Sequence, residues 1–215
     1  MLAQIVLFDG FDPLDVVAPY DVLAAGGGLA GGALAVELVS AEGAREVPSG
    51  SGLLTLRATA RLDPGRADLV VVPGAAGQLS DDHESGEDSV MTLLARAARS
   101  PLAGLLAAAV ERPEVTVATV CGGSTLLAMA GLIGDRPATT HRLGLAALAA
   151  TGARVVDARV VDDGDLVTAS SVTSGLDLGL HLLERFLGAE VAHGVEQLIG
   201  HERRGVVWRA AGAAR

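Results

Sequence analysis

The stretch Val115-Thr-Val-Ala-Thr-Val-Cys121-Gly122-Gly123-Ser124 runs directly into Thr125-Leu-Leu-Ala-Met-Ala130. β-Branched residues before Cys121 favour a buried strand, and the alanine- and leucine-rich segment after the turn favours a helix. Two glycines suit a tight turn between them, because they remove the crowding that side chains would cause. Such a turn presents its cysteine at the carboxyl edge of a sheet, as in a nucleophile elbow. The stretch therefore predicts an α/β fold with Cys121 as its nucleophile.

A lone cysteine is more often a small buried hydrophobic residue than a nucleophile, and this alternative stands beside the catalytic one. The position of Cys121 at a strand end, in front of Gly122-Gly123, favours the catalytic interpretation. The helix that begins after the turn would bring its positive end near the sulfur. This arrangement predicts a lowered pKa of the thiol.

Short valine-rich runs alternate with longer alanine- and leucine-rich segments along the rest of the chain. This alternation predicts a parallel sheet covered by helices. Strands are expected at 3–8, 34–40, 68–72 and 115–120, with one small hairpin within 46–60 and another from 155–161 and 166–169 around Asp163-Gly164. Helices are expected at 15–25, closing on Gly26-Gly27-Gly28, and at 90–99, 102–111, 122–130, 141–150, 174–187 and 190–204, with a polar surface loop at 78–89. Residues 1–215 are expected to form one domain, with 205–215 as a C-terminal tail.

Composition excludes several classes of function. All 16 basic residues are arginine, so neither a lysine Schiff base nor a P-loop lysine is possible. The net charge of −10 gives little attraction for nucleic acid. A single cysteine leaves neither an intrachain disulfide nor a zinc site of several thiolates. The N-terminal apolar run lacks a basic region and no apolar run is long enough to span a membrane, so a cytoplasmic protein without a membrane partner is expected.

Two glycine positions predict backbone donors at the same edge as the cysteine. Gly74 ends the valine-rich run before it. Backbone N–H groups at Gly74 or Ala75 and at Gly122 could converge there on an oxyanion or a bound water. A turn that needs glycine only for its dihedral angles is the alternative.

Three acids follow the first strand in the segment Asp9-Gly10-Phe11-Asp12-Pro13-Leu14-Asp15. Asp15 is either a helix N-cap or an acid at the carboxyl edge, where doubly wound sheets bind ligands. A carboxyl beside a thiolate has its pKa raised by the like charge, which suits a general acid. Composition does not choose among Asp9, Asp12 and Asp15 as the working acid.

Several ordered motifs resemble the ThiJ/PfpI superfamily. They are Leu14-Asp15-Val-Val-Ala-Pro19-Tyr-Asp21-Val-Leu, Val72-Pro73-Gly74 and Val120-Cys121-Gly122-Gly123-Ser124. Leu126-Leu-Ala-Met-Ala-Gly131-Leu132, Ala138-Thr139-Thr140-His141 and Val172-Thr-Ser-Gly175-Leu-Asp177 resemble its isonitrile hydratase branch. The resemblance implies a flavodoxin-like α/β sandwich of the class I glutamine amidotransferase-like type, with helices on both faces of the sheet. It also implies a homodimer.

The resemblance implies a role for each matching residue. Cys121 would be the nucleophile, Asp15 its acidic partner, and Gly74 and Gly122 would mark the backbone donors. Two departures occur at Gly122. The hydratase branch has a threonine there, so the role of its hydroxyl would pass to Ser124. The peptidase branch has a histidine there, so peptidase activity is not expected.

The histidines allow further interpretations. His141 and Thr140 are possible pocket residues, whereas His83 is expected in a solvated loop and His181 in a structural role. A metal-ligand cluster is conceivable near the C-terminus, but its histidines lie eight residues apart, so no metal site is expected from His193, Glu196, Gln197, His201 and Glu202. Trp208 is expected to anchor a dimer or a helix contact.

The leading expectation is a cofactor-independent lyase that adds water to an isonitrile, a small-molecule substrate, and yields an N-substituted formamide. The second is an enzyme that uses the same cysteine on another electrophilic small molecule, in a glyoxalase-like or biosynthetic reaction. The third is a non-catalytic redox or ligand sensor.

Overall fold

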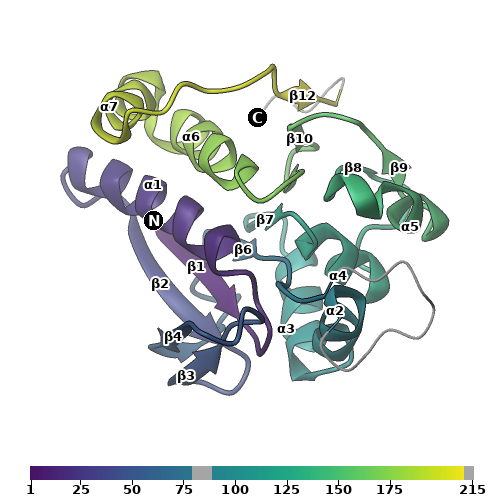
Figure 1. Ribbon diagram of the computed structural model, residues 1–215. Helices are drawn as coiled ribbons and strands as arrows, with labels where there is room; N and C mark the ends of the chain where they lie inside the picture. The colour runs from purple at the N-terminus through teal and green to yellow at the C-terminus, as the bar shows by residue number, and fades with distance from the viewer. Residues whose placement is uncertain (79–88, 211–215) are drawn as a thin grey trace.

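The computed structural model of the protein describes residues 1–78 and 89–210 and centres on one eight-stranded sheet (Figure 1). Its order is β12 (Trp208–Arg209), β10 (Val160–Asp162), β11 (Leu166–Ala169), β7 (Thr116–Val120), β6 (Leu69–Val72), β1 (Leu2–Leu7), β2 (Ala35–Ser40) and β5 (Ala60–Arg61). Neighbouring strands are parallel except β10 and β11, which form an antiparallel hairpin. The predicted mostly parallel sheet and the hairpin around Asp163-Gly164 are confirmed.

Helices pack in two groups, one on each side of this sheet, as Figure 1 shows. The first group is α1 (Pro13–Leu29), α6 (Ser174–Leu187) and α7 (Ala189–Ile199). The second is α2 (Val90–Ala98), α3 (Pro101–Val110), α4 (Gly123–Met129) and α5 (Leu145–Ala150), with the 3₁₀ turn η1 (Arg142–Gly144) before α5. The central strands are almost entirely buried, which explains their aliphatic composition. The carboxyl ends of β1, β6 and β7 meet at one edge of the sheet, where the predicted site lies.

Two small sheets lie outside the central one. β3 (Arg45–Pro48) and β4 (Thr55–Ala58) form the hairpin predicted within 46–60. β8 (Pro137–Ala138) and β9 (Arg154–Val155) form a short parallel pair that was not predicted. Val155 therefore belongs to β9, and the strand expected at 155–161 is two separate segments.

α1 continues beyond the end predicted for it, through Gly26 and Gly27 to Leu29. A Cβ atom on Gly26 would lie 2.3 Å from Leu183 Cδ2 of α6, and one on Gly27 would lie 2.1 Å from the carbonyl oxygen of Leu34. These glycines therefore permit close packing of α1 against α6 and the chain leading to β2. The prediction was wrong because glycine serves here for close approach and not for helix termination.

The C-terminal segment also differs from its prediction. α7 ends at Ile199 and not at residue 204, because Gly200 adopts a left-handed conformation with φ of 65°. Beyond it, Trp208 and Arg209 pair with Val161 and Asp162 as the edge strand β12. Part of the predicted tail is therefore part of the sheet, and half-buried Trp208 lies in a strand.

Within the described ranges, no single helix has the length and apolar composition needed to cross a membrane. α2 and α3 meet those criteria only when taken together, and they are bent by 71° at the break between them. The predicted loop at 78–89, with His83, lies outside the described residues except for its two ends.

Candidate active site

Cys121 lies on the sharp turn between β7 and α4, which follows the predicted strand–turn–helix order. Its φ of 54° makes it the only non-glycine residue with positive φ in the described part of the chain. This conformation costs a residue other than glycine about 1–3 kcal/mol, so surrounding contacts must hold it. The Cys121 N–H donates to the carbonyl oxygen of Ala169 on β11 at 3.0 Å. The side chain is buried, with 8% of its surface exposed.

Glycines allow the end of β6 to pack directly on the turn at Cys121-Gly122-Gly123, which we call the elbow. A Cβ atom on Gly123 would lie 2.2 Å from the carbonyl oxygen of Val72. One on Gly74 would lie 2.6 Å from the nitrogen of Gly122 and 2.8 Å from Asp15 Oδ2. Backbone atoms cannot move aside as the end of a flexible side chain can, so neither position has room for a side chain.

The geometry distinguishes the three candidate acids. Asp12 is the N-cap of α1, and its carboxylate accepts a hydrogen bond from the Leu14 N–H at 2.9 Å. Asp9 is more than half exposed and pairs with Arg45 at 2.8 Å. Asp15 is the third residue of α1 and is completely buried. The N-cap interpretation of Asp15 is therefore wrong, and Asp15 is the acid that lies at the elbow.

Burial dominates the ionisation of both groups. It raises the pKa of Asp15 well above its ordinary value, the charge of Asp12 raises it further, and contacts with the Gly74 N–H and the Cys121 thiol oppose the shift. Burial also raises the pKa of the Cys121 thiol, and the Asp15 carboxylate adds to that shift against a hydrogen bond from the Gly122 N–H. The predicted lowering of the thiol pKa is thus wrong. α4 has only 7 residues, and its positive end does not outweigh burial and the adjacent carboxylate.

One of the predicted oxyanion donors already has an acceptor. The Gly74 N–H donates to Asp15 Oδ2 at 2.9 Å and so orients the carboxyl group. The other carboxyl oxygen, Asp15 Oδ1, is buried and has no hydrogen-bond partner among the described residues. Ala75 is buried beside Gly74, and the interaction of the Gly122 N–H with the Cys121 thiol opposes the rise in the thiol pKa.

Two predicted pocket residues are buried inside the protein. Ser124 Oγ lies 2.6 Å from Thr119 Oγ1 of β7, and Thr140 Oγ1 donates to the carbonyl oxygen of Cys121 at 2.8 Å. Both side chains are fully buried, so neither hydroxyl lines an open pocket. His141 is half-buried at the start of η1, where its Nδ1 accepts a hydrogen bond from the Leu143 N–H at 3.3 Å.

The remaining histidines lie apart from this elbow. His181 is buried and hydrogen-bonded to Asp162 at 2.8 Å, a structural contact of the kind predicted for it. His193 contacts its neighbours on α7, whereas His201 contacts Asp177 at 3.4 Å. In the ranges that the structure describes, no three histidine, cysteine, aspartate or glutamate side chains could together hold a metal ion.

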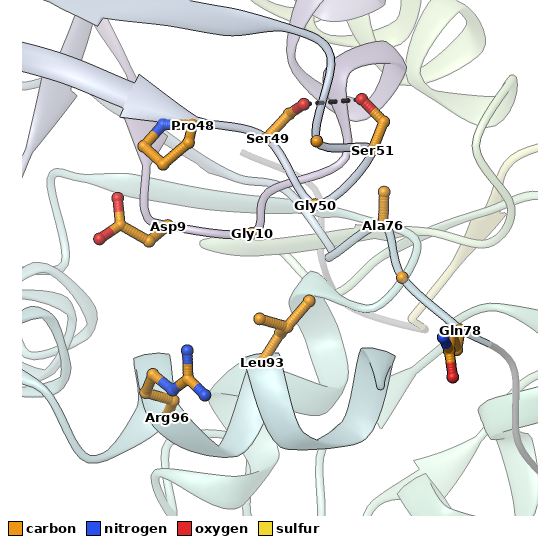
Figure 2. A pocket seen from close by; sticks show the side chains of 12 residues that line it. Asp9, Gly10, Pro48, Ser49, Gly50, Ser51, Ala76, Gln78, Leu93 and Arg96 are labelled. Atoms are coloured by element: carbon orange, nitrogen blue, oxygen red, sulfur yellow. Dashed lines mark hydrogen bonds between the residues drawn. The ribbon is translucent and has the colours of Figure 1, made fainter. Parts of the chain in front are cut away.

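A cavity of about 720 Å³ lies between the loop after β1, the β3–β4 hairpin and α2 (Figure 2). Leu93 and Arg96 extend toward it from α2, and Ser49 and Ser51 are hydrogen-bonded to each other on the opposite side. Gly10, Gly50 and Ala76 contribute to its wall. Cys121 is not among the residues that line it. The lining therefore places no candidate nucleophile at the wall of this cavity.

Leu94 is a neighbour of the site that sequence reasoning missed. It is buried on α2, and its Cδ1 atom lies 3.0 Å from the position of a Cβ atom on Gly122. It thus occupies the space that a larger residue after the cysteine would need. Leu94 belongs to the ordinary apolar face of a helix, and no sequence pattern distinguishes it from core leucines.

Fold and site together define a flavodoxin-like α/β protein with a buried cysteine on a sharp strand-to-helix turn beside a buried carboxyl group. Residues 1–185 match the DJ-1/PfpI family, and the chain belongs to that family. It is 32% identical to the isonitrile hydratase of Pseudomonas putida over 193 residues, which are 89% of this chain and 74% of that protein. The predicted superfamily is thereby confirmed.

Two solved structures share the fold. A THiJ/PfpI family protein from Pseudomonas syringae is 24% identical with a TM-score of 0.76, over 95% of this chain and 76% of its own. DJ-1beta of Drosophila melanogaster is 19% identical with a TM-score of 0.77, over 94% of this chain and 98% of its own. The predicted flavodoxin-like sandwich is confirmed by these similarities.

Proposed function

We propose that this protein is a cofactor-independent lyase that adds water to an isonitrile and releases an N-substituted formamide. The observation behind the proposal is the pairing of the strained, buried Cys121 with Asp15, whose Oδ1 has no partner among the described residues. Membership of the DJ-1/PfpI family and the similarity to an isonitrile hydratase support the choice of reaction.

The reaction begins when Cys121 Sγ bonds to the terminal carbon of the isonitrile. Asp15 gives its proton to that carbon and takes the proton of the thiol, so the product is a thioimidate, R–N=CH–S. Water then adds across the C=N bond, and one of its protons reaches the nitrogen. Cleavage of the C–S bond releases R–NH–CHO and restores the thiol. One water is consumed in each turnover, and nothing is oxidised or reduced.

The ionisation of the two groups supports these roles. The raised pKa of Asp15 favours its protonated form, which can give a proton to the isonitrile carbon. The raised pKa of the Cys121 thiol means that its proton must leave as the sulfur attacks, and the carboxyl group beside it is the acceptor. Ala75 and Gly122 are the backbone donors left to stabilise negative charge, because the Gly74 N–H donates to Asp15.

The test measures loss of the isonitrile infrared band and formation of the formamide by mass spectrometry, with simple aryl and alkyl isonitriles. We expect turnover by the wild type, none by Cys121→Ala, and a kcat about 10²–10⁴-fold lower for Asp15→Asn. Asp21→Asn, at an exposed position on the same helix, is the matched control and should keep wild-type activity. Full activity of Cys121→Ala would exclude the mechanism.

One observation favours a second candidate, in which the same nucleophile acts on another electrophile such as a reactive carbonyl compound. Leu94 fills the space beside Gly122, where the resemblance to the hydratase branch implies a threonine hydroxyl. An enzyme without that hydroxyl could act on a substrate that does not need it. If the wild type converts glyoxals but no isonitrile, with Cys121→Ala inactive on both, the second candidate is the correct one.

A further inference from the structure

The carbonyl oxygen of Cys121 needs a hydrogen-bond donor that the sheet does not provide. β7 pairs with β11 up to Val120, and the turn at φ of 54° then directs the chain out of the ladder. Within the described ranges, this oxygen accepts its hydrogen bond from Thr140 Oγ1, at 2.8 Å. A buried carbonyl without a donor is costly, so this contact helps to hold the conformation of the elbow.

Thr125 extends the contact into a directed chain. Its Oγ1 lies 3.0 Å from Thr140 Oγ1. The Thr140 proton is already donated to the carbonyl oxygen of Cys121, which can only accept, so Thr125 must be the donor to Thr140. Both threonines are buried, and Gly144 packs over the pair, with its Cβ position 3.3 Å from Thr140 Cγ2. This series of hydrogen bonds runs from Thr125 on α4, through Thr140 after β8, to the carbonyl oxygen of Cys121.

We propose that Thr140, supported by Thr125, is a positioning residue that holds the Cys121 turn so that the thiol meets Asp15. The backbone N–H of Cys121 is held by Ala169 at 3.0 Å, and Thr140 holds its carbonyl oxygen. The two ends of the strained residue are thus fixed by separate segments. This inference deepens the proposed function, and it rests on that function only where turnover is measured.

The experiment compares Thr140→Val, Thr140→Ser and Thr125→Val with the wild type in two assays. The first is the kcat and KM for an isonitrile, and the second is the pH dependence of Cys121 alkylation by iodoacetamide. Thr151→Val is the matched control, because Thr151 Oγ1 also donates to a carbonyl oxygen, that of Leu148 at 2.7 Å, at an exposed position after α5.

We expect Thr140→Val to lower kcat by about tenfold with KM little changed. The midpoint pH of alkylation should fall by about half a unit or more, because the thiol moves away from Asp15. Thr140→Ser should keep the wild-type kcat and midpoint pH, because serine retains the hydroxyl group. Thr125→Val should change both values less than Thr140→Val does, since Thr125 acts through Thr140. Thr151→Val should change neither.

A wild-type kcat and alkylation midpoint in folded Thr140→Val would overturn the proposal. If Thr140→Val does not fold, unchanged values in Thr125→Val would overturn it equally. If the wild type converts no isonitrile but the alkylation midpoint shifts as expected, the proposed function fails and the positioning role of Thr140 stands.

Discussion

Gly74→Ala should lower the free energy of unfolding, because Gly74 packs directly against the backbone of the elbow. The added Cβ would lie 2.6 Å from the Gly122 nitrogen, 2.8 Å from Asp15 Oδ2 and 3.0 Å from the Gly122 Cα, where ordinary contacts begin at 3.4 Å. The two backbone segments must therefore move apart by several tenths of an ångström. Overpacking of this kind costs about 1–3 kcal/mol, and 1 kcal/mol corresponds to roughly 2–4 °C in Tm at this chain length. For a cost of about 2 kcal/mol we expect Tm to fall by roughly 4–8 °C.

The matched control is Gly104→Ala, on the exposed side of α3, where a Cβ would have no neighbour within 4 Å. It should raise stability by about 0.5–1 kcal/mol, because glycine is a poor helix former. Differential scanning calorimetry gives both values of Tm, and alkylation of Cys121 reports on the elbow in the same samples. If Gly74→Ala melted at the wild-type temperature with unchanged alkylation, the close packing of Gly74 on the elbow would be refuted.

Three further predictions concern the same site. In the wild type, the free energy of unfolding should fall by up to about 1.4 kcal/mol per pH unit as pH rises above 4, because native Asp15 keeps a proton that the unfolded chain has lost. Asp15→Asn should abolish this fall, and urea titrations from pH 4 to 8, with Asp21→Asn as the control, test this. Alkylation of wild-type Cys121 should have its midpoint above the ordinary thiol pKa and Asp15→Asn should lower it, so a wild-type midpoint below pH 8 would contradict the raised pKa. Gly122→Thr should lower the free energy of unfolding by about 1–3 kcal/mol in the wild type and by less in the Leu94→Ala protein. Urea titrations measure both losses, and equal losses would show that Leu94 does not limit the space beside Gly122.

The sequence predicts the fold and the elbow well because their causes are local. The alternation of strand and helix patterns predicts the layers, and the run ending at Cys121-Gly122-Gly123 predicts the turn between β7 and α4. Glycines are harder to interpret, because the same residue ends a helix at Gly200 and allows close packing at Gly26. The difference depends on Leu183, which is far along the chain and which no local pattern identifies.

The chemistry of the site was predicted less well, because it depends on how deeply Cys121 is buried and on contacts with residues distant in sequence. A helix N-terminus behind Cys121 favours a lowered thiol pKa, but burial and Asp15 reverse the direction. Neither depth nor the distance to Asp15 can be inferred from the segment around the cysteine. Thr140 was predicted as a pocket residue, whereas its hydroxyl binds the carbonyl oxygen of Cys121 from 19 residues away. Buried hydroxyl groups of this kind have no sequence signature.

The proposed lyase and a redox sensor make opposite demands on Cys121, because the lyase must add both a sulfur atom and a proton to one carbon. A sensor cysteine needs a low pKa and an accessible sulfur, because the thiolate is the form that oxidants attack. Cys121 is 8% exposed, and burial and Asp15 raise the pKa of its thiol. Addition to an isonitrile instead needs both a sulfur nucleophile and a proton at the same carbon. A thiol and a carboxyl group whose pKa values are both raised by burial suit that pair, because a proton can pass from one to the other as the sulfur attacks. The burial of Cys121 and the raised pKa of its thiol therefore support the proposed proton-coupled addition more than oxidant sensing.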